Sequence, residues 1–280
     1  MKRTITITAD DFGLTRGITD TILKVIDEGP VRLVSILTNG EAVEYALSEY
    51  KKRAAYVTLA VHLTLTEGKA LLPFPTIPHL VDARGVFKHS IAGLWGAYLF
   101  ASHQTRAALR REVRAEMEKQ CAVVRTALGT NALTVNGHQH VHMIPFVFEE
   151  LMAIRGVGAV RIVRENFFLC GIPSPVNVLA RLVLAMLSQR ATKSARALGI
   201  RTNDWFVGFL YSGHMNEDIA RSGIAHAGTG VIEVLFHPGS ALPDELSRWR
   251  ESRAQIAWHY AKARRREREA LKKIHYERTN

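Results

Sequence analysis

The sequence predicts a single α/β domain with a (β/α) barrel-like fold and mostly parallel strands. The chain has 280 residues and 47% hydrophobic content, enough for one large core. Short strand-like runs alternate with helical stretches along most of it, and no repeat or low-complexity linker divides it. Alternation of this kind is typical of a parallel sheet or barrel. We expect one domain over residues 1–245 and a basic helical extension over 246–280.

The expected strands are short apolar or alternating runs that end in turn residues. The first, over 3–9, alternates Thr with Ile, and a later one runs directly into His237, Pro238 and Gly239. Parallel α/β folds bind ligands beyond the carboxyl ends of their strands, so the residues that follow each strand are the candidates for function. The expected strands are 3–9, 31–37, 57–65, 133–136, 159–163 and 231–236, and the expected helices are 17–28, 41–53, 104–128, 146–155 and 243–274.

Asp10 and Asp11 directly follow the first strand. Successive side chains on extended backbone point to opposite sides, so one carboxylate could bind a cation while the other stays free. A lone Asp pair at such a place more often caps a helix or forms an Asx turn. Its function therefore depends on which other polar groups reach the same edge of the sheet.

Three histidines, His138, His140 and His142, follow the strand over 133–136. On extended backbone they share a face, and on a helix His138 and His142 lie one turn apart, so either geometry could chelate a metal. Imidazole with carboxylate suits zinc, iron, nickel or manganese, whereas magnesium and calcium prefer oxygen ligands. The alternative is a solvated histidine-rich loop.

Two further histidines lie on or after strands: His62 within 57–65, and His237 after 231–236. Alone, a histidine such as His62 is more often a satisfied core residue than a ligand. Together with the two clusters, however, they place polar groups on or at the ends of four strands. The long irregular segment 67–90 follows the strand of His62 and is either a functional lid or a surface excursion.

The charge is strongly positive, +11 overall, and from 248 to 280 eleven Lys or Arg stand against four Glu. Such a run is usually a solvated helix face, and no base-reading motif accompanies it, so no nucleic-acid partner is expected. The apolar and basic segment 176–201 either packs on the core or lies on a membrane surface. Cys121, Cys170 and the absence of a leader predict a cytoplasmic protein, at most peripheral at the inner membrane face.

Four segments resemble the YdjC-like carbohydrate deacetylases, relatives of the polysaccharide deacetylases. They are 8–14 (TADDFGL), 61–63 (VHL), 137–145 (GHQHVHMIP) and 236–239 (FHPG). Two further stretches, 77–87 and 203–215, resemble the branch that accompanies hopanoid lipid biosynthesis (HpnK-like). Gln139 and Gly239 stand where that branch usually has Lys and Ala.

The resemblance implies a set of roles. Asp11, His62 and His138 would hold one divalent metal, magnesium or zinc, with Asp10 as general base and His237 as general acid. Candidate contacts of the substrate or of the ligands are Glu67, His140, His142 and Arg164.

The implied reaction is metal-dependent removal of an N-acetyl group from an amino sugar of an oligosaccharide or glycolipid, including a hopanoid-linked or other lipid-linked sugar. The resemblance also implies a homodimer. The alternatives are a metal-dependent phosphoesterase, because Asp and His at barrel strand ends also serve phosphate chemistry, and a non-enzymatic protein that binds membranes or nucleic acid through its basic segments.

Overall fold

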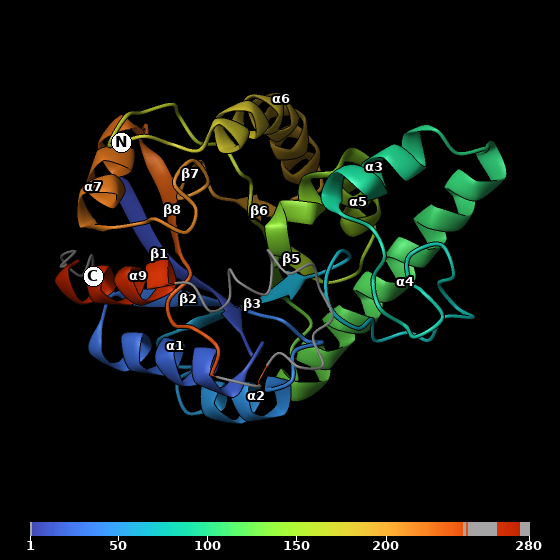
Figure 1. Ribbon diagram of the computed structural model, residues 1–280, viewed down its shortest axis with the longest axis horizontal. Coiled ribbons are helices and arrows are strands. Elements are labelled where there is room, and N and C mark those ends of the chain that lie inside the picture. The colour runs from blue at the N-terminus through green and yellow to red at the C-terminus, as the bar shows by residue number, and fades with distance from the viewer. Residues whose placement is uncertain (1, 243–244, 246–261, 275–280) are drawn as a thin grey trace.

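The computed structural model describes residues 2–242, 245 and 262–274, and this part of the chain forms one curved sheet surrounded by helices (Figure 1). All eight strands of the sheet are parallel, in the order β6-β5-β4-β3-β2-β1-β8-β7. The strands are β1 (Arg3–Phe12), β2 (Val31–Ile36), β3 (Thr58–Leu63), β4 (Leu133–Gly137), β5 (Val157–Val160), β6 (Arg201–Thr202), β7 (Trp205–Val207) and β8 (Gly230–Phe236).

Helices connect most of the strands and cover the outside of the sheet (Figure 1). The described helices are α1 (Arg16–Glu28), α2 (Val43–Lys51), α3 (Ile91–Leu99), α4 (His103–Leu128), the short 3₁₀ segment η1 (His138–Met143), α5 (Pro145–Met152), α6 (Pro175–Ala197), α7 (Glu217–His226) and α9 (Lys262–Lys273).

The segment that follows β5 forms hydrogen bonds with the residues around β7, at the other edge of the sheet. The edge strands β6 and β7 do not pair with each other. Instead, the Asn203 side chain accepts a hydrogen bond from Ile162 N at 2.7 Å and donates one to Ile162 O at 2.8 Å. Phe206 N then donates to Arg164 O at 2.8 Å. The sheet is thus curled and nearly closed, which confirms the predicted barrel-like α/β fold.

Local sequence explains why the first βα unit forms. The Thr15 hydroxyl accepts a hydrogen bond from Ile18 N and caps the start of α1. Ile18, Ile22 and Ile26 then recur at helical spacing and are fully or almost fully buried. Burying each such side chain stabilises the fold by roughly 1.5–3 kcal/mol, so this apolar stripe fixes α1 against the sheet.

Most of the predicted elements are confirmed within two to four residues. Six elements were not among those expected from the sequence: β6, β7, η1, α3, α6 and α7. The strands among them have only two and three residues, too short to show a period.

The predicted helix over 243–274 falls largely outside the described residues, and its described part is α9. This helix packs against α1 and α7, and its Arg264 is fully buried. A domain boundary at 245/246 stays a prediction.

Hydrogen bonds to side chains of α4 hold the irregular segment that follows β3. The Glu116 carboxylate accepts hydrogen bonds from Leu71 N and Leu72 N at 3.0 Å each, and Glu112 accepts one from His79 N at 2.8 Å. These bonds satisfy backbone donors that are partly shielded from water. They also fix the loop that carries Glu67.

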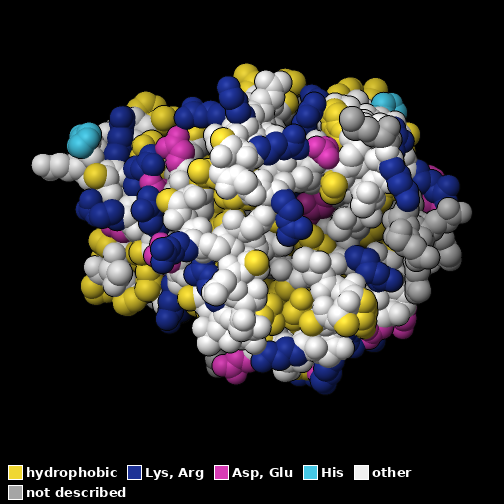
Figure 2. All heavy atoms as spheres, turned by 180° about the vertical axis from the view of Figure 1, so that it is seen from behind, with side chains coloured by type: hydrophobic (Ala, Val, Ile, Leu, Met, Phe, Trp, Pro, Cys, Tyr) yellow, Lys and Arg dark blue, Asp and Glu magenta, His cyan; other side chains and the backbone are white. Residues whose placement is uncertain are grey.

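In the described part of the chain, no helix combines the length and apolar character needed to cross a bilayer. Lys and Arg side chains are scattered over the back face among hydrophobic and neutral groups (Figure 2). Cys121 and Cys170 are both free thiols.

Candidate active site

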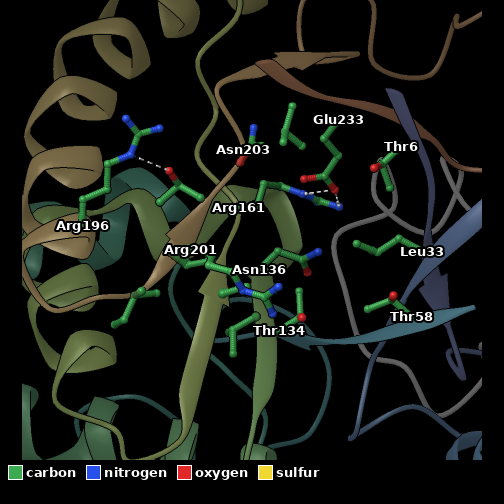
Figure 3. Close-up of a pocket in the computed structure, with 16 residues that line it drawn as sticks. Thr6, Leu33, Thr58, Thr134, Asn136, Arg161, Arg196, Arg201, Asn203 and Glu233 are labelled. Atoms are coloured by element: carbon green, nitrogen blue, oxygen red, sulfur yellow. Dashed lines mark hydrogen bonds and ion pairs between the residues drawn. The ribbon is translucent and has the colours of Figure 1, made fainter. Parts of the chain in front are cut away.

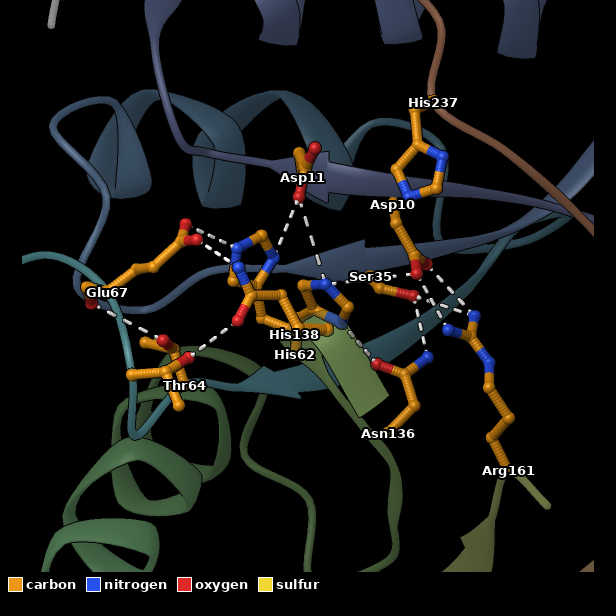
Figure 4. Close-up of polar contacts among 12 residues, drawn as sticks. Asp10, Asp11, Ser35, His62, Thr64, Glu67, Asn136, His138, Arg161 and His237 are labelled. Carbon is orange, nitrogen blue, oxygen red and sulfur yellow. Dashed lines mark hydrogen bonds and ion pairs between the residues drawn. The ribbon is translucent and has the colours of Figure 1, made fainter. Parts of the chain in front are cut away.

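Three predicted ligands converge at the carboxyl ends of the strands: Asp11 from β1, His62 from β3 and His138 from the start of η1 (Figure 4). All three are buried, and one potential ligand atom from each lies within 4.8 Å of the others. Asp11 Oδ1 is 3.3 Å from His138 Nδ1 and 3.8 Å from His62 Nε2. The three residues are spread over more than 120 positions of the sequence, and the parallel sheet brings them together.

Both aspartates face this site because the backbone of β1 is irregular at Asp11. Its φ of 70° lies in the left-handed region, and the register against β2 shifts between Ala9 and Phe12. Asp10 Oδ2 and Asp11 Oδ1 therefore both lie 3.8 Å from His62 Nε2. The expectation that the two carboxylates point to opposite sides is wrong, since it assumed regular extended backbone. A left-handed non-glycine residue costs about 1–2 kcal/mol, and such strain is typical of functional sites.

Hydrogen bonds orient both histidines so that one ring nitrogen of each faces Asp11. His62 Nδ1 lies 2.6 Å from Asn136 Oδ1, an acceptor, and Asn136 Nδ2 donates to Ser35 at 2.8 Å. His138 Nε2 lies 2.7 Å from a Glu67 carboxylate oxygen. Each of these nitrogens therefore carries a proton, which leaves the lone pairs of His62 Nε2 and His138 Nδ1 for a cation when the rings are neutral.

These residues fit a divalent metal ion. The buried Asp11 Oδ1 makes no hydrogen bond of good geometry within the described chain, and it lies beside two histidine nitrogens. An isolated buried carboxylate oxygen is costly unless a cation or donor satisfies it. Two imidazole nitrogens and one carboxylate oxygen form a three-ligand set that leaves further coordination positions open. His62 and His138 would hold the ion together with Asp11.

Without an ion, His138 itself carries the positive charge. Although burial opposes charging, the Glu67 and Asp11 carboxylates raise the pKa of His138 well above its usual 6.5. Burial, by contrast, lowers the pKa of His62. A proton on His138 therefore occupies the place where a cation is expected.

Asp10 is held by Arg161, which the sequence did not single out. The guanidinium donates to both carboxylate oxygens, at 2.7 and 2.9 Å, and both residues are buried (Figure 4). Although burial opposes ionisation, Arg161 and His62 lower the pKa of Asp10 far below 3.8. Arg161 also pairs with Glu233 at 2.7 Å. Asp10 is thus a fixed, ionised carboxylate beside the metal ligands.

The three histidines of η1 separate into three environments. Gln139 and His140 adopt left-handed φ angles of 51° and 58°, so the segment is neither the extended strand nor the regular helix considered from the sequence. His140 lies between the rings of Phe206 and Phe209, at 5.4 Å from each, and borders the site cavity. His142 Nε2 lies 2.9 Å from Arg161 O, away from the metal ligands.

Of the remaining candidates, two border the site and one does not. His237 lines the cavity, and burial lowers its pKa to about 4, so it is neutral near pH 7. Glu67 holds His138 and also accepts a hydrogen bond from Gln139. Arg164 is exposed and stacks over Trp205 at 4.1 Å, outside the cavity lining.

The site opens into a cavity of about 560 Å³. Besides the site residues, its lining includes residues from three separate segments: Ile91, Val176, Asn177, Phe209 and Ser212. A second cavity of about 550 Å³ is lined by residues of several strands, among them Thr6, Asn136 and Glu233, and by Arg161 (Figure 3). It contains none of the metal ligands, so the first cavity is the candidate substrate site.

The fold and site define an α/β barrel-like protein with a buried Asp-His-His metal-type centre. The sequence matches the model of the family described as YdjC-like protein over residues 4–277, so the chain belongs to this family.

Several proteins of known name or structure are similar. A chitooligosaccharide deacetylase of Escherichia fergusonii is 28% identical over 171 residues, 60% of this chain and 62% of that protein, so the match spans less than two thirds of that relative's length. A carbohydrate deacetylase of Mus musculus is 30% identical over 250 residues, 84% of this chain and 77% of that protein. A crystal structure from Enterococcus faecalis V583, of a protein with a suggested role in cellobiose-phosphate cleavage, superposes with a TM-score of 0.66 at 21% identity, covering 97% of this chain and 90% of that one; this likeness concerns the fold.

Proposed function

We propose that this protein is a metal-dependent hydrolase that removes an N-acetyl group from an amino sugar. The observation that carries the proposal is the buried group of Asp11, His62 and His138 beside the ionised Asp10. Membership of the YdjC-like family and similarity to proteins named carbohydrate and chitooligosaccharide deacetylases support it. A divalent ion, zinc or magnesium, is the proposed cofactor, and the histidine nitrogens favour zinc.

The chain supplies the proton transfers of the reaction. A divalent ion held by the three ligands supplies Lewis-acid activation of water and of the amide carbonyl. Asp10 is the proposed general base, because Arg161 keeps it ionised and fixes both of its oxygens. The same pairing makes Asp10 a weak base in the resting protein, so Asp10 would accept a proton only from a water whose pKa is lowered at the site.

His237 is the proposed general acid for the departing amine. It borders the same cavity as Asp10. Because burial lowers its pKa to about 4, His237 starts the reaction neutral near pH 7. It must therefore gain a proton before it can act as an acid, and in the proposed reaction this is the proton that Asp10 takes from the attacking water within the shared cavity.

The reaction class is tested by comparing two products. The purified protein, loaded with zinc, is incubated with N,N′-diacetylchitobiose and separately with an aryl phosphate. We expect acetate from the sugar and no phosphate from the ester. Phosphate release without acetate would favour the phosphoesterase, the alternative that the same ligand types allow.

A lipid-linked substrate is the finer form of the proposal, and an apolar ridge beside the site supports it. The ridge runs from the loop before α6 along one face of that helix, where Val176, Leu179, Leu182 and Met186 follow at helical spacing. Ile172 is 98% exposed, and Val176, which also lines the cavity, is 74% exposed. Exposed apolar clusters of this kind mark interaction surfaces. The ridge residues are Phe167, Leu169, Ile172, Val176, Leu179, Leu182 and Met186.

The charge of α6 suits an anionic lipid surface, because the helix contains Arg181, Arg190, Lys193 and Arg196 and no acidic residue. Co-sedimentation with vesicles of phosphatidylglycerol and phosphatidylcholine tests the ridge. We expect Ile172→Asp with Leu179→Asp to abolish sedimentation and Leu198→Asp, at the far end of α6, to leave it unchanged. If the wild-type protein does not sediment, a soluble oligosaccharide is the better-supported substrate. A hopanoid carrier and a homodimer stay predictions.

A further inference from the structure

The C-terminal helix α9 reaches into the candidate metal centre through Arg264. This arginine has no exposed surface and is among the largest fully buried side chains described. Its Nη1 donates to Asp11 Oδ2 at 2.8 Å, and its Nε donates to Gly239 O at 2.6 Å. One guanidinium thus joins the Asp11 carboxylate, near the end of β1, to the backbone after β8.

Glu267 lies three residues further along α9, on the same face of the helix. It is also fully buried, and its carboxylate accepts hydrogen bonds from His237 N at 2.5 Å and Met215 N at 3.3 Å. The same carboxylate lies 4.0 Å from His237 Nδ1. Through Arg264 and Glu267, α9 therefore contacts both Asp11 and His237, the proposed general acid.

We propose that Arg264 and Glu267 are positioning residues, and that α9 completes the site rather than being a separate appendage. The proposal rests on the metal-ligand assignment above. Asp11 is strained, since its φ is 70°, and its carboxylate is fully buried. By binding Oδ2, Arg264 selects the rotamer in which Oδ1 faces the two histidines. Planar guanidinium groups with two separate partners impose such geometry, which a mobile ammonium does not.

Positioning and simple charge neutralisation predict opposite effects on metal affinity. Arg264 is a cation close to the proposed cation site, so removing its charge alone should tighten metal binding by Coulomb's law. Removing its hydrogen bond to Asp11 should weaken metal binding, because Asp11 Oδ1 is no longer held toward the two histidines. The sign of the change in affinity therefore identifies the role of Arg264.

The test is a titration of the metal-free full-length protein with Co²⁺, followed by visible absorption, which reports the ligand geometry around the ion. For Arg264→Gln we expect at least about tenfold weaker binding and an altered spectrum, within the range for loss of an outer partner of a ligand. Arg266→Gln is the matched control, an exposed arginine on the same helix. Unchanged or tighter binding by Arg264→Gln, with the wild-type spectrum, overturns the proposal.

Two further variants keep the test decisive if Arg264→Gln does not fold. Arg264→Lys preserves the buried charge but lacks the planar guanidinium, so we expect a folded protein that binds Co²⁺ more weakly. A wild-type cobalt affinity and spectrum in this variant would contradict the positioning role of Arg264. Glu267→Gln contacts no ligand, so it should keep cobalt affinity and lower kcat without raising KM; weakened cobalt binding would contradict this division. If the wild-type protein itself fails to bind Co²⁺, the ligand assignment fails rather than the role of α9.

Discussion

Arg161 donates hydrogen bonds to both carboxylate oxygens of Asp10, at 2.7 and 2.9 Å, in a fully buried pair. The same arginine pairs with Glu233 from β8, so two carboxylates compensate one guanidinium. Buried charges of this kind are tolerated only when they are paired and hydrogen-bonded. The pair keeps Asp10 ionised beside the candidate ligands.

Replacing Asp10 by Asn should separate catalysis from metal binding. Asn has nearly the same shape, so Asp11 and both histidines should still hold the ion, while the proton acceptor is lost. General-base catalysis contributes roughly 100 to 10,000-fold, so acetate release should fall by about that factor. Acetate release and bound metal are measured on the same samples, with Asp20→Asn, on the exposed side of α1, as control. Undiminished acetate release would refute the base assignment.

The histidines of η1 should differ in their effect on metal content. His138→Ala removes a nitrogen that lies 3.3 Å from Asp11 Oδ1, whereas His142 contacts the backbone of Arg161 instead. We expect metal analysis of purified protein to find His138→Ala metal-poor and His142→Ala close to one equivalent. An empty site in His142→Ala with a filled one in His138→Ala would mean that the ligand is misassigned.

Metal affinity should rise with pH. The Glu67 and Asp11 carboxylates outweigh burial and raise the pKa of His138 well above 6.5, so near neutral pH a proton competes with the ion for this residue. If one proton leaves as the ion binds, affinity should increase about tenfold per pH unit below that pKa. Calorimetric titration with Zn²⁺ between about pH 6 and about pH 8 measures this slope. In Glu67→Gln the slope should flatten, because a main cause of the raised pKa is gone. A wild-type affinity that falls or stays constant would contradict the account of His138.

Glu165 should make the fold less stable as pH rises. Burial raises its pKa from 4.5 to about 7, even though Gly208 N and Leu210 N donate to it. The folded state therefore binds a proton that the unfolded chain has lost, and stability falls between these two pKa values by on the order of 3 kcal/mol. Glu267, with a pKa also raised to about 7, adds a similar slope.

Urea unfolding at several pH values checks this prediction. At low pH, Glu165→Gln should be less stable than the wild type, because the amide NH2 group cannot accept the hydrogen bond that a carboxyl oxygen of Glu165 accepts. Between pH 4.5 and 7, its free energy of unfolding should fall by about half as much as that of the wild type, because only Glu267 still has a raised pKa. Glu118→Gln, on an exposed position of α4, serves as control. A decline as steep in Glu165→Gln as in the wild type would show that Glu165 does not cause it.

The strand pattern predicts that polar groups gather at one edge of the sheet, and the resemblance to the YdjC-like family selects Asp11, His62 and His138 among them as ligands. Asp11 and His138 follow runs that the sequence marks as strands, His62 lies within one, and parallel topology gathers such residues at one edge. What the strand pattern cannot show is local irregularity. The left-handed backbone at Asp11 and His140 depends on packing around the site, and it changes which way these side chains point.

The buried arginines show a second limit of sequence reasoning. Arg161 and Glu233 each interrupt an apolar run that the sequence marks as a strand. Such charged residues within apolar runs could have predicted the buried ion pair that they form. Arg264 carried no such signal, because it stands among other basic residues in a helix that composition describes as solvated. Only the packing of α9 against α1 shows that it is buried.

The most direct test of the central claim is acetate release from N,N′-diacetylchitobiose as metal is returned to the metal-free protein. We predict that the protein releases no acetate without metal and that the rate rises with added Zn²⁺ until one equivalent is bound, in the wild type but not in His138→Ala. Acetate release at the full rate in metal-free protein, or in His138→Ala, would contradict a hydrolase built on Asp11, His62 and His138.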